Sequence, residues 1–518
     1  MRYQAKMLWK HMPIFPVTLF CILGLYALPM QVLAANRLPD EVIKVLNKHK
    51  IPAADLSLYV TKVNADTPAL TINAAVPRNP ASVMKLLTSL MALDTLGPNY
   101  RWRTDAYIRG KLKQGILDGD LILKGYGDPA FTPERFWQFL YALRARGIRV
   151  IQGDLILDGS YFSPPQDQRG DFDGRPQRAY NALPHPLSLN YQVTQIELVP
   201  DQNDNSVRAF TYPPLANLEI HNRLKLVNGT CRGKRASPLV RVAEQRNGAT
   251  LELQGEYAAS CPEWSKSYLV MQPTDHLGGA FSAIWKELGG ELKGSVRTAL
   301  LPQGAKRFYT IESPTLAEVI RDMNKYSNNL MSRMLLLTVT AEHGILPASP
   351  EQGLGLVKDW LRKWQLPSGL VKVDNGSGLA RDAQVSSEII GRMLQAAYVS
   401  PLMPEYLASL PLVGIDGTMR KRLRNTELVG RAHIKTGTLN GVSAMAGYVQ
   451  DRHDQRWVVA FIINHKGLQS WQGKQVQDTV LRWLYQGPDT KSLKGQIATA
   501  ALSKCEDGKK STSCRSLQ

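Results

Sequence analysis

The stretch NPASVMKLLTSL, residues 79–90, places Ser82 and Lys85 three positions apart at the beginning of an apolar run. The run ends at Gly97-Pro98, a pair that terminates helices. The spacing predicts a helix that opens just before Ser82, with Lys85 one turn further along on the same face. Its leucines and methionines recur at helical spacing, which indicates that this helix belongs to a core.

The serine–lysine pair has two interpretations. An adjacent amine can take the proton of a serine if its surroundings hold that amine neutral, and helix-terminal N–H groups attract incoming negative charge. Ser82 would then be a nucleophile and Lys85 its base. Alternatively, serine is routine at a helix start and lysine is routine on a surface. Ser82-Val-Met-Lys85 is the only S-x-x-K in the chain, but alone it favours the second interpretation.

A second candidate pair is Ser327 and Asn329, in the segment MNKYSNNLMSRML. A hydroxyl and a carboxamide two residues apart can move a proton and hold a substrate amide. Ser188-Leu-Asn190 has the same spacing, but it falls in a region that we expect to be inserted, so we discount it. The structural alternative for Ser327 and Asn329 is helix capping.

The third candidate is the only K-T-G of the chain, Lys435-Thr436-Gly437, followed by Thr438. It begins a segment that the sequence predicts to be one strand of a hairpin. A lysine there offers a fixed positive charge to a carboxylate, the threonine adds a hydroxyl donor, and the glycine lets a substrate backbone approach closely. The alternative is an exposed strand end beside a turn. Taken in order, S-x-x-K, S-x-N and K-T-G form the signature of active-site-serine penicillin-binding proteins and β-lactamases.

The pattern of strands and helices predicts one α+β domain that is split in sequence. Its parts are residues 35–102 and 273–487, and a β-rich insertion occupies 103–272. Within the insertion, the near-repeat of DGDLILKG and QGDLILDG suggests a duplicated hairpin. We expect strands at 55–74, 433–439, 443–449 and 457–464, and helices at 314–343, 351–364, 384–398 and 471–485, with another from about residue 274.

The two ends of the chain differ from the rest. Residues 1–34 have a basic start, a short apolar stretch and small residues at Val32 and Ala34, which predicts a secretory signal that is cleaved after Ala34. An uncleaved membrane anchor is the alternative, although the apolar run is short and interrupted by prolines. Residues 488–518 form a polar, basic tail that we expect to be mobile.

The composition favours an anionic partner. Cleavage after residue 34 removes three basic and no acidic residues, which lowers the formal net charge from +19 to +16. A basic exported protein suits cell-wall polymer or membrane headgroups, and export argues against nucleic acid. Peripheral contact with a membrane therefore stays open.

Four cysteines remain after cleavage, namely Cys231, Cys261, Cys505 and Cys514. An even number in an exported chain predicts two disulfides, and proximity favours 231–261 and 505–514, with free thiols as the alternative. The nine histidines form no H-E-x-x-H or other tight ligand cluster, so we expect no catalytic metal.

Beyond the three motifs, the chain resembles the low-molecular-mass, class C penicillin-binding proteins of the penicillin-binding protein 4 type, a family of D-alanyl-D-alanine carboxypeptidases and endopeptidases. The 245 residues from Ser82 to Ser327 match the large insertion of that family. GYGDP at 125–129, VDNGSGLARD at 373–382 and LVGIDGTMRKRL at 412–423 look like its other motifs. The resemblance covers about residues 40–487. It implies a transpeptidase/β-lactamase-like domain, an antiparallel sheet flanked by helices.

The resemblance also implies roles for the candidate residues. Ser82 would be the acylated nucleophile and Lys85 its general base, while Ser327 and Asn329 would transfer protons and position the substrate. The middle residue of that motif, Asn328, is often aspartate in the family, but it is not the chemical position.

In the same way, Lys435 and Thr436 would bind the terminal carboxylate of the substrate, with Gly437 beside them. The N–H groups of Ser82 and Thr438 would form an oxyanion hole. Ala380-Arg381 stands where the family commonly has a serine after G-S-G-L, so the role of that loop is left open.

The implied reaction is acyl transfer without a cofactor. The serine would attack the D-Ala-D-Ala amide of a peptidoglycan stem peptide, and water would release the shortened peptide in the periplasm. Attack on a cross-link would make the protein an endopeptidase, and a β-lactam would be an inhibitory acyl donor. The alternatives are a β-lactamase or esterase of the same fold and a catalytically idle wall-binding protein. The sequence leaves open the preference between the two peptidase activities, the diamino acid of the stem peptide and the oligomeric state.

Overall fold

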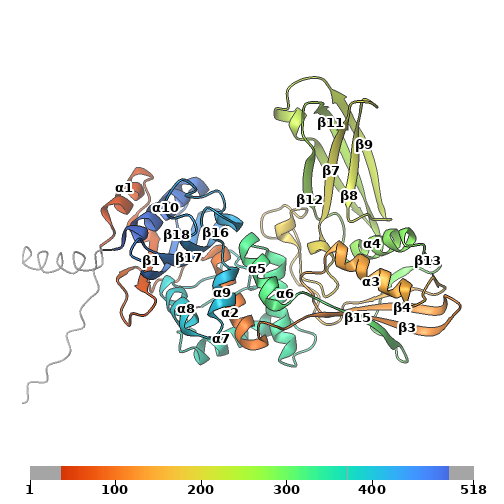
Figure 1. Cartoon of the computed structure of the whole chain (residues 1–518), viewed down its shortest axis with the longest axis horizontal. Coiled ribbons are helices and arrows are strands. Elements are labelled where there is room, and N and C mark those ends of the chain that lie inside the picture. The colour runs from red at the N-terminus through yellow and green to blue at the C-terminus, as the bar shows by residue number, and fades with distance from the viewer. Residues whose placement is uncertain (1–36, 370, 489–518) are drawn as a thin grey trace, which may run out of the picture.

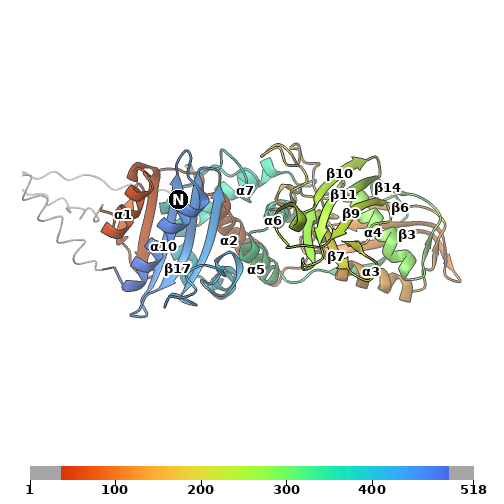
Figure 2. The same ribbon diagram turned by 90° about the horizontal axis from the view of Figure 1, so that it is seen from above.

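The computed structural model describes residues 37–369 and 371–488. The expected signal, the Cys505–Cys514 pair and nearly all of the tail lie outside this part of the chain. The described residues form two bodies side by side (Figures 1 and 2). Both ends of the described chain lie in one body, and the other body is built from the middle of the sequence.

The first body is built on a five-stranded sheet in which every pair is antiparallel. Its strands, in spatial order, are β16 (Ala432–Leu439), β17 (Val442–Gln450), β18 (Arg456–Asn464), β1 (Leu56–Lys62) and β2 (Leu70–Ile72). The central strands β17 and β18 are buried along almost their whole length, because their small and β-branched side chains face helices on both sides of the sheet.

Two helical layers cover this sheet. One core lies between the sheet and helices α1 (Asp40–Lys48) and α10 (Ser470–Gln486). The core on the other face involves α2 (Lys85–Leu96), α5 (Leu316–Tyr326), α6 (Asn329–Glu342), α7 (Pro350–Lys363), α8 (Ser387–Val399) and α9 (Met403–Ser409). An α+β architecture of an antiparallel sheet flanked by helices is therefore confirmed.

The helix expected over 314–343 is in fact two helices. A capping box of Thr315 and Glu318 begins α5, which ends at Ser327 in the left-handed region at φ 58°. The Asn328 side chain then accepts a hydrogen bond from the Met331 N–H and begins α6. The chain therefore changes direction between two helices at the candidate S-x-N motif.

The second body is larger than the expected insertion. Its main sheet contains β3 (Arg103–Lys113), β4 (Ile116–Gly125), β5 (Val150–Ile151), β6 (Leu155–Asp158), β13 (Glu291–Leu292), β14 (Val296–Thr298) and β15 (Lys306–Glu312). Helices α3 (Pro133–Ala145) and α4 (Pro273–Glu287) share its core. Because α4 and β13–β15 pack here, we propose that the insertion extends to about residue 312. The other domain boundaries stay predictions.

The near-repeat of DGDLILKG and QGDLILDG is not a duplicated hairpin, and that expectation is wrong. The two segments are β4 and β6, which pair side by side in parallel, with Leu121 opposite Leu155. Helix α3 lies between them in sequence, as a parallel pair requires a crossover.

Two three-stranded sheets stand above this body in Figure 1. One contains β7 (Thr194–Asp201), β8 (Ser206–Tyr212) and β12 (Trp264–Tyr268); the other contains β9 (Leu218–Val227), β10 (Leu239–Gln245) and β11 (Gly248–Ala258). A disulfide joins Cys231 and Cys261 at the edge of their shared core, which confirms that predicted pairing.

Candidate active site

Ser82 lies in a 3-10 turn, Ala81–Met84, that leads directly into α2. Two neighbouring segments approach this turn closely. A Cβ on Gly378 would lie 1.9 Å from the Ala81 carbonyl oxygen, and a Cβ on Gly437 would lie 2.9 Å from the Ser82 nitrogen. Glycine is therefore needed at both positions, and the turn is held between the G-S-G-L loop and strand β16.

Lys85 is fully buried, and its Nζ lies within hydrogen-bond distance of three oxygens. These are Ser82 Oγ at 3.0 Å, Asn329 Oδ1 at 2.7 Å and the Ser377 carbonyl oxygen at 2.7 Å. Burial, reinforced by the nearby charge of Lys435, holds the pKa of Lys85 well below its ordinary value. The geometry thus favours a neutral amine beside the serine.

The hydrogen bonds of Lys85 also orient that amine. A neutral amine has two hydrogens and one lone pair. Carbonyl oxygens can only accept, so those of Asn329 and Ser377 take the two hydrogens. The lone pair then faces the Ser82 hydroxyl, which is the arrangement that proton removal from a serine requires.

Lys435 is the second buried lysine of the site. Its Nζ donates to Ser327 Oγ and to the Thr436 carbonyl oxygen, both at 2.8 Å. Burial lowers the pKa of Lys435 to about 7. The Thr436 hydroxyl lies 3.0 Å from that of Thr418, at a cavity of about 440 Å³ that Thr438 also lines.

The S-x-N motif connects the two lysines, because Ser327 contacts Lys435 and Asn329 contacts Lys85. Asn328, between Ser327 and Asn329, is the residue that caps the helix. The side chains of Ser327 and Asn329 are therefore available to contact the two lysines. The competing match is not in the site. Ser188 Oγ donates to the His185 carbonyl oxygen, so it is bonded within its own loop.

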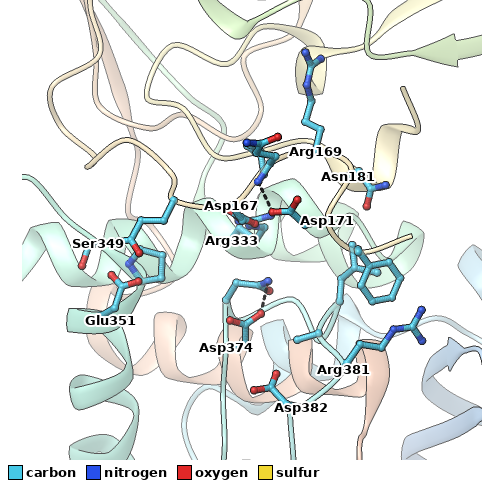
Figure 3. Close-up of a pocket in the computed structure, with 18 of the residues that line it drawn as sticks. Asp167, Arg169, Asp171, Asn181, Arg333, Ser349, Glu351, Asp374, Arg381 and Asp382 are labelled. Carbon is cyan, nitrogen blue, oxygen red and sulfur yellow. Dashed lines mark hydrogen bonds and ion pairs between the residues drawn. The ribbon is translucent and has the colours of Figure 1, made fainter. Parts of the chain in front are cut away.

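A larger cavity of about 740 Å³ lies between the two bodies and is lined by none of Ser82, Lys85, Ser327 and Asn329 (Figure 3). Asn375 lines it from the loop that also carries Ser377, and Asn181 lines it from the second body. The wall is strongly charged. Arg333, almost buried, pairs with Asp167 at 2.8 Å, and Asp374, Arg381 and Asp382 lie on the opposite side in Figure 3. The cavity therefore presents charges of both signs, next to the loop whose Ser377 carbonyl oxygen accepts from Lys85.

Several contacts of the site were not predicted from the sequence. The Asn329 amide donates to the Tyr180 carbonyl oxygen at 3.0 Å, so the inserted segment reaches the candidate site. Lys325 pairs with Asp416 at 2.6 Å, which fixes the G-x-D-G-T segment against α5. The G-S-G-L and G-x-D-G-T motifs were visible in the sequence, but the sequence assigned their residues no function. A main-chain carbonyl such as that of Tyr180 leaves no pattern in a sequence.

In the described ranges, 37–369 and 371–488, no three His, Cys, Asp or Glu side chains gather as metal ligands would. Nor does any helix in those ranges have the length and apolar character needed to cross a membrane.

Comparison with known proteins places this geometry in a family. Residues 38–486 match the D-Ala-D-Ala carboxypeptidase 3 (S13) family. The chain belongs to this family. A D-Ala-D-Ala carboxypeptidase of this kind is a serine hydrolase of the penicillin-binding protein 4 type, which confirms the resemblance seen in the motifs.

Individual relatives agree over most of the carboxypeptidase chain. The D-alanyl-D-alanine carboxypeptidase DacB of Haemophilus influenzae is 25% identical over 385 residues, 74% of this chain and 79% of its own. The D-alanyl-D-alanine carboxypeptidase of an Actinomadura species is 26% identical over 421 residues, 77% of this chain and 76% of its own. The crystal structure of penicillin-binding protein 4 from Haemophilus influenzae has a TM-score of 0.72 at 23% identity, covering 86% of this chain and 99% of that one, and so supports the fold.

Proposed function

We propose that this carboxypeptidase forms an acyl-enzyme on Ser82, with Lys85 as the general base. The observation that carries the proposal is the triple contact of the buried Lys85 amine, which aims a lone pair at the serine hydroxyl. The substrate would be the D-Ala-D-Ala end of a peptidoglycan stem peptide, and its terminal carboxylate would lie against Lys435 and Thr436.

In the first step, Ser82 Oγ attacks the amide carbonyl while its proton passes to Lys85 Nζ. The N–H groups of Ser82 and Thr438 stabilise the oxyanion, since β16 lies directly against the serine turn. The C–N bond then breaks as the leaving D-alanine nitrogen takes that proton from Lys85, with the Ser327 hydroxyl, which Lys435 holds, as the relay, so Lys85 is neutral again. Water attacks the ester with Lys85 again as base, and the shortened peptide leaves.

The same step on a cross-link between two stem peptides would be an endopeptidase reaction. The charged cavity lined by Asn375 and Asn181 has room for part of a stem peptide, which supports this second activity. Penicillin would acylate the same serine and deacylate slowly. The basic composition, the Cys231–Cys261 disulfide and the sequence of residues 1–34 support export to the periplasm with a cleaved signal.

Labelled penicillin tests the assignment. We expect covalent label on the peptide that contains Ser82, and none in Ser82→Ala. Ser89→Ala is the matched control, because Ser89 lies two turns along the same segment and its hydroxyl bonds to the main-chain carbonyls of Lys85 and Leu86 and to Asn324, away from Ser82. Label retained in Ser82→Ala would refute the nucleophile. Rapid release of hydrolysed penicillin would favour a β-lactamase, and no acylation of the wild type would favour an idle wall-binding protein.

A further inference from the structure

A separate cavity of about 640 Å³ lies where the end of α6 meets strands β3 and β4. Cationic and aromatic side chains dominate its wall. They are Arg101, Arg103, Lys124, Tyr100, Tyr126 and Tyr161. One carboxylate, that of Glu342, also lines it. The formal charge of the wall is therefore positive, and none of these residues contacts Ser82 or either catalytic lysine in the hydrogen bonds described above.

This cavity adjoins the charged cavity of Figure 3. Phe162 and Ala348 form a parallel bridge between the two bodies, in which the Ser163 N–H donates to the Ala348 carbonyl oxygen at 2.8 Å. Ser163 lines the cavity of Figure 3, whereas Tyr161, two residues earlier, lines the second cavity. Only this short bridge separates the two cavities.

The one carboxylate in the wall is already occupied. The hydroxyls of Tyr100 and Tyr161 donate to the same oxygen of Glu342, at 2.9 and 2.8 Å. Burial, with the adjacent carboxylate, raises the pKa of both tyrosines, so they remain neutral donors. Glu342 therefore accepts hydrogen bonds from the two tyrosines rather than pairing with the arginines and the lysine of the wall. These cations can bind the anionic group of a ligand.

The cations are only partly paired. Lys124 pairs with Asp158 at 3.1 Å, and Arg101 donates to the Ser313 carbonyl oxygen at 2.6 Å. Arg103 lies 3.8 Å from Asp105, half of its side chain is exposed, and its guanidinium stacks 4.2 Å above the Tyr126 ring. A guanidinium has five N–H donors, so Arg103 can hold these partners and still donate to a carboxylate from its exposed edge.

We propose that this cavity binds a sugar ring that carries a carboxylate, the chemistry of N-acetylmuramic acid in the glycan strand of peptidoglycan. Arg103 and Arg101 would hold the carboxylate, and the tyrosine rings would contact the C–H face of the sugar. In a strand without stem peptides the lactyl carboxylate of this sugar is free, so such a strand is the polymeric ligand. The proposal rests on the proposed function for its choice of polymer, and it adds a glycan contact remote from the serine.

The test compares two sugars on the full chain. N-acetylmuramic acid and N-acetylglucosamine differ only in the lactyl ether and its carboxylate, and lactate supplies the carboxylate without the ring. We expect N-acetylmuramic acid to bind more tightly than either in titration calorimetry, and Arg103→Ala to weaken it by about tenfold, as loss of one charge-assisted hydrogen bond does. Arg109→Ala is the matched control, because Arg109 is exposed on the same strand and does not line the cavity.

Equal affinity for the two sugars, lactate binding as tightly as N-acetylmuramic acid, or an equal effect of the two arginine variants would each overturn the proposal. Penicillin labelling of Arg103→Ala should match wild type and shows that the variant is folded. Sugar binding does not require acylation of Ser82, so failure of the acyl-enzyme proposal would appear in the labelling and failure of this one in the titration.

Discussion

Replacement of Lys435 by methionine should stabilise the protein while impairing its activity. Lys435 is fully buried, and burial lowers its pKa from an ordinary value of 10.5 to about 7. At pH 7 that difference costs the folded state about 4 kcal/mol, because the unfolded lysine is charged and solvated. The two hydrogen bonds of its amine offset roughly 2 kcal/mol. Lys435→Met should therefore raise the free energy of unfolding by about 2 kcal/mol at pH 7.

The sign of the pH dependence follows from proton counts. Between about pH 7 and pH 10.5 the unfolded chain holds a proton on Lys435 that the folded chain lacks. The free energy of unfolding of the wild type thus rises with pH across that window, by about 2 kcal/mol from pH 7 to pH 9. The variant lacks this contribution, so its advantage should shrink nearly to zero at pH 9.

Denaturant unfolding of the full chain at pH 7 and pH 9 measures this difference, and comparison with the wild type cancels the titration of other groups. Lys421→Met is the control, since Lys421 is exposed beside the cavity at Thr436 and its replacement removes a lysine that is not buried. Penicillin acylation should fall by about 10- to 100-fold in Lys435→Met, for loss of one charged hydrogen bond to the carboxylate. An advantage that stays constant from pH 7 to pH 9 would refute the burial argument.

Two further substitutions test the packing. Gly437→Ala should slow penicillin acylation at least about tenfold. The added Cβ would lie 2.6 Å from the Pro80 carbonyl oxygen and 2.9 Å from the Ser82 nitrogen, so β16 would have to move. An unchanged acylation rate would contradict this expectation. Joint replacement of Cys231 and Cys261 by alanine should destabilise the upper sheets by about 3–4 kcal/mol, for a closed loop of this length. Limited proteolysis should then cleave those sheets faster while acylation stays unchanged, and loss of acylation would show that the disulfide supports the site.

Much of the first body could be predicted from local patterns. The apolar run after Ser82 and its stop at Gly97 correspond to α2, which is buried on nearly every side. The strands expected at 433–439 and 443–449 are β16 and β17, because β-branched and small residues there meet helices on both faces. Each of these elements is specified by residues close together in sequence.

What the patterns missed depends on distant partners or on single backbone conformations. Helix α3 has a Thr132 cap and Pro133 at its first position, but it lies among β-rich segments that dominated the interpretation. The parallel pairing of β4 with β6 is not visible in either strand, because identical residues can pair in either direction. The left-handed conformation of Ser327 is likewise unmarked, since asparagine or glycine would be its usual signal.

In the candidate site, too, the sequence identifies the residues but not the contacts that they make in the fold. The three motifs give the side chains, but they do not explain why an ordinary lysine should be a base. That property comes from burial and from two oxygen acceptors on segments 244 and 292 residues away from Lys85. Because one acceptor is the main-chain oxygen of Ser377, substitution of that side chain alone would not remove it. The basicity of Lys85 is thus a property of the folded α2–α6 contact and of the G-S-G-L loop, and the stability that its burial costs is the consequence of holding an amine neutral beside a serine.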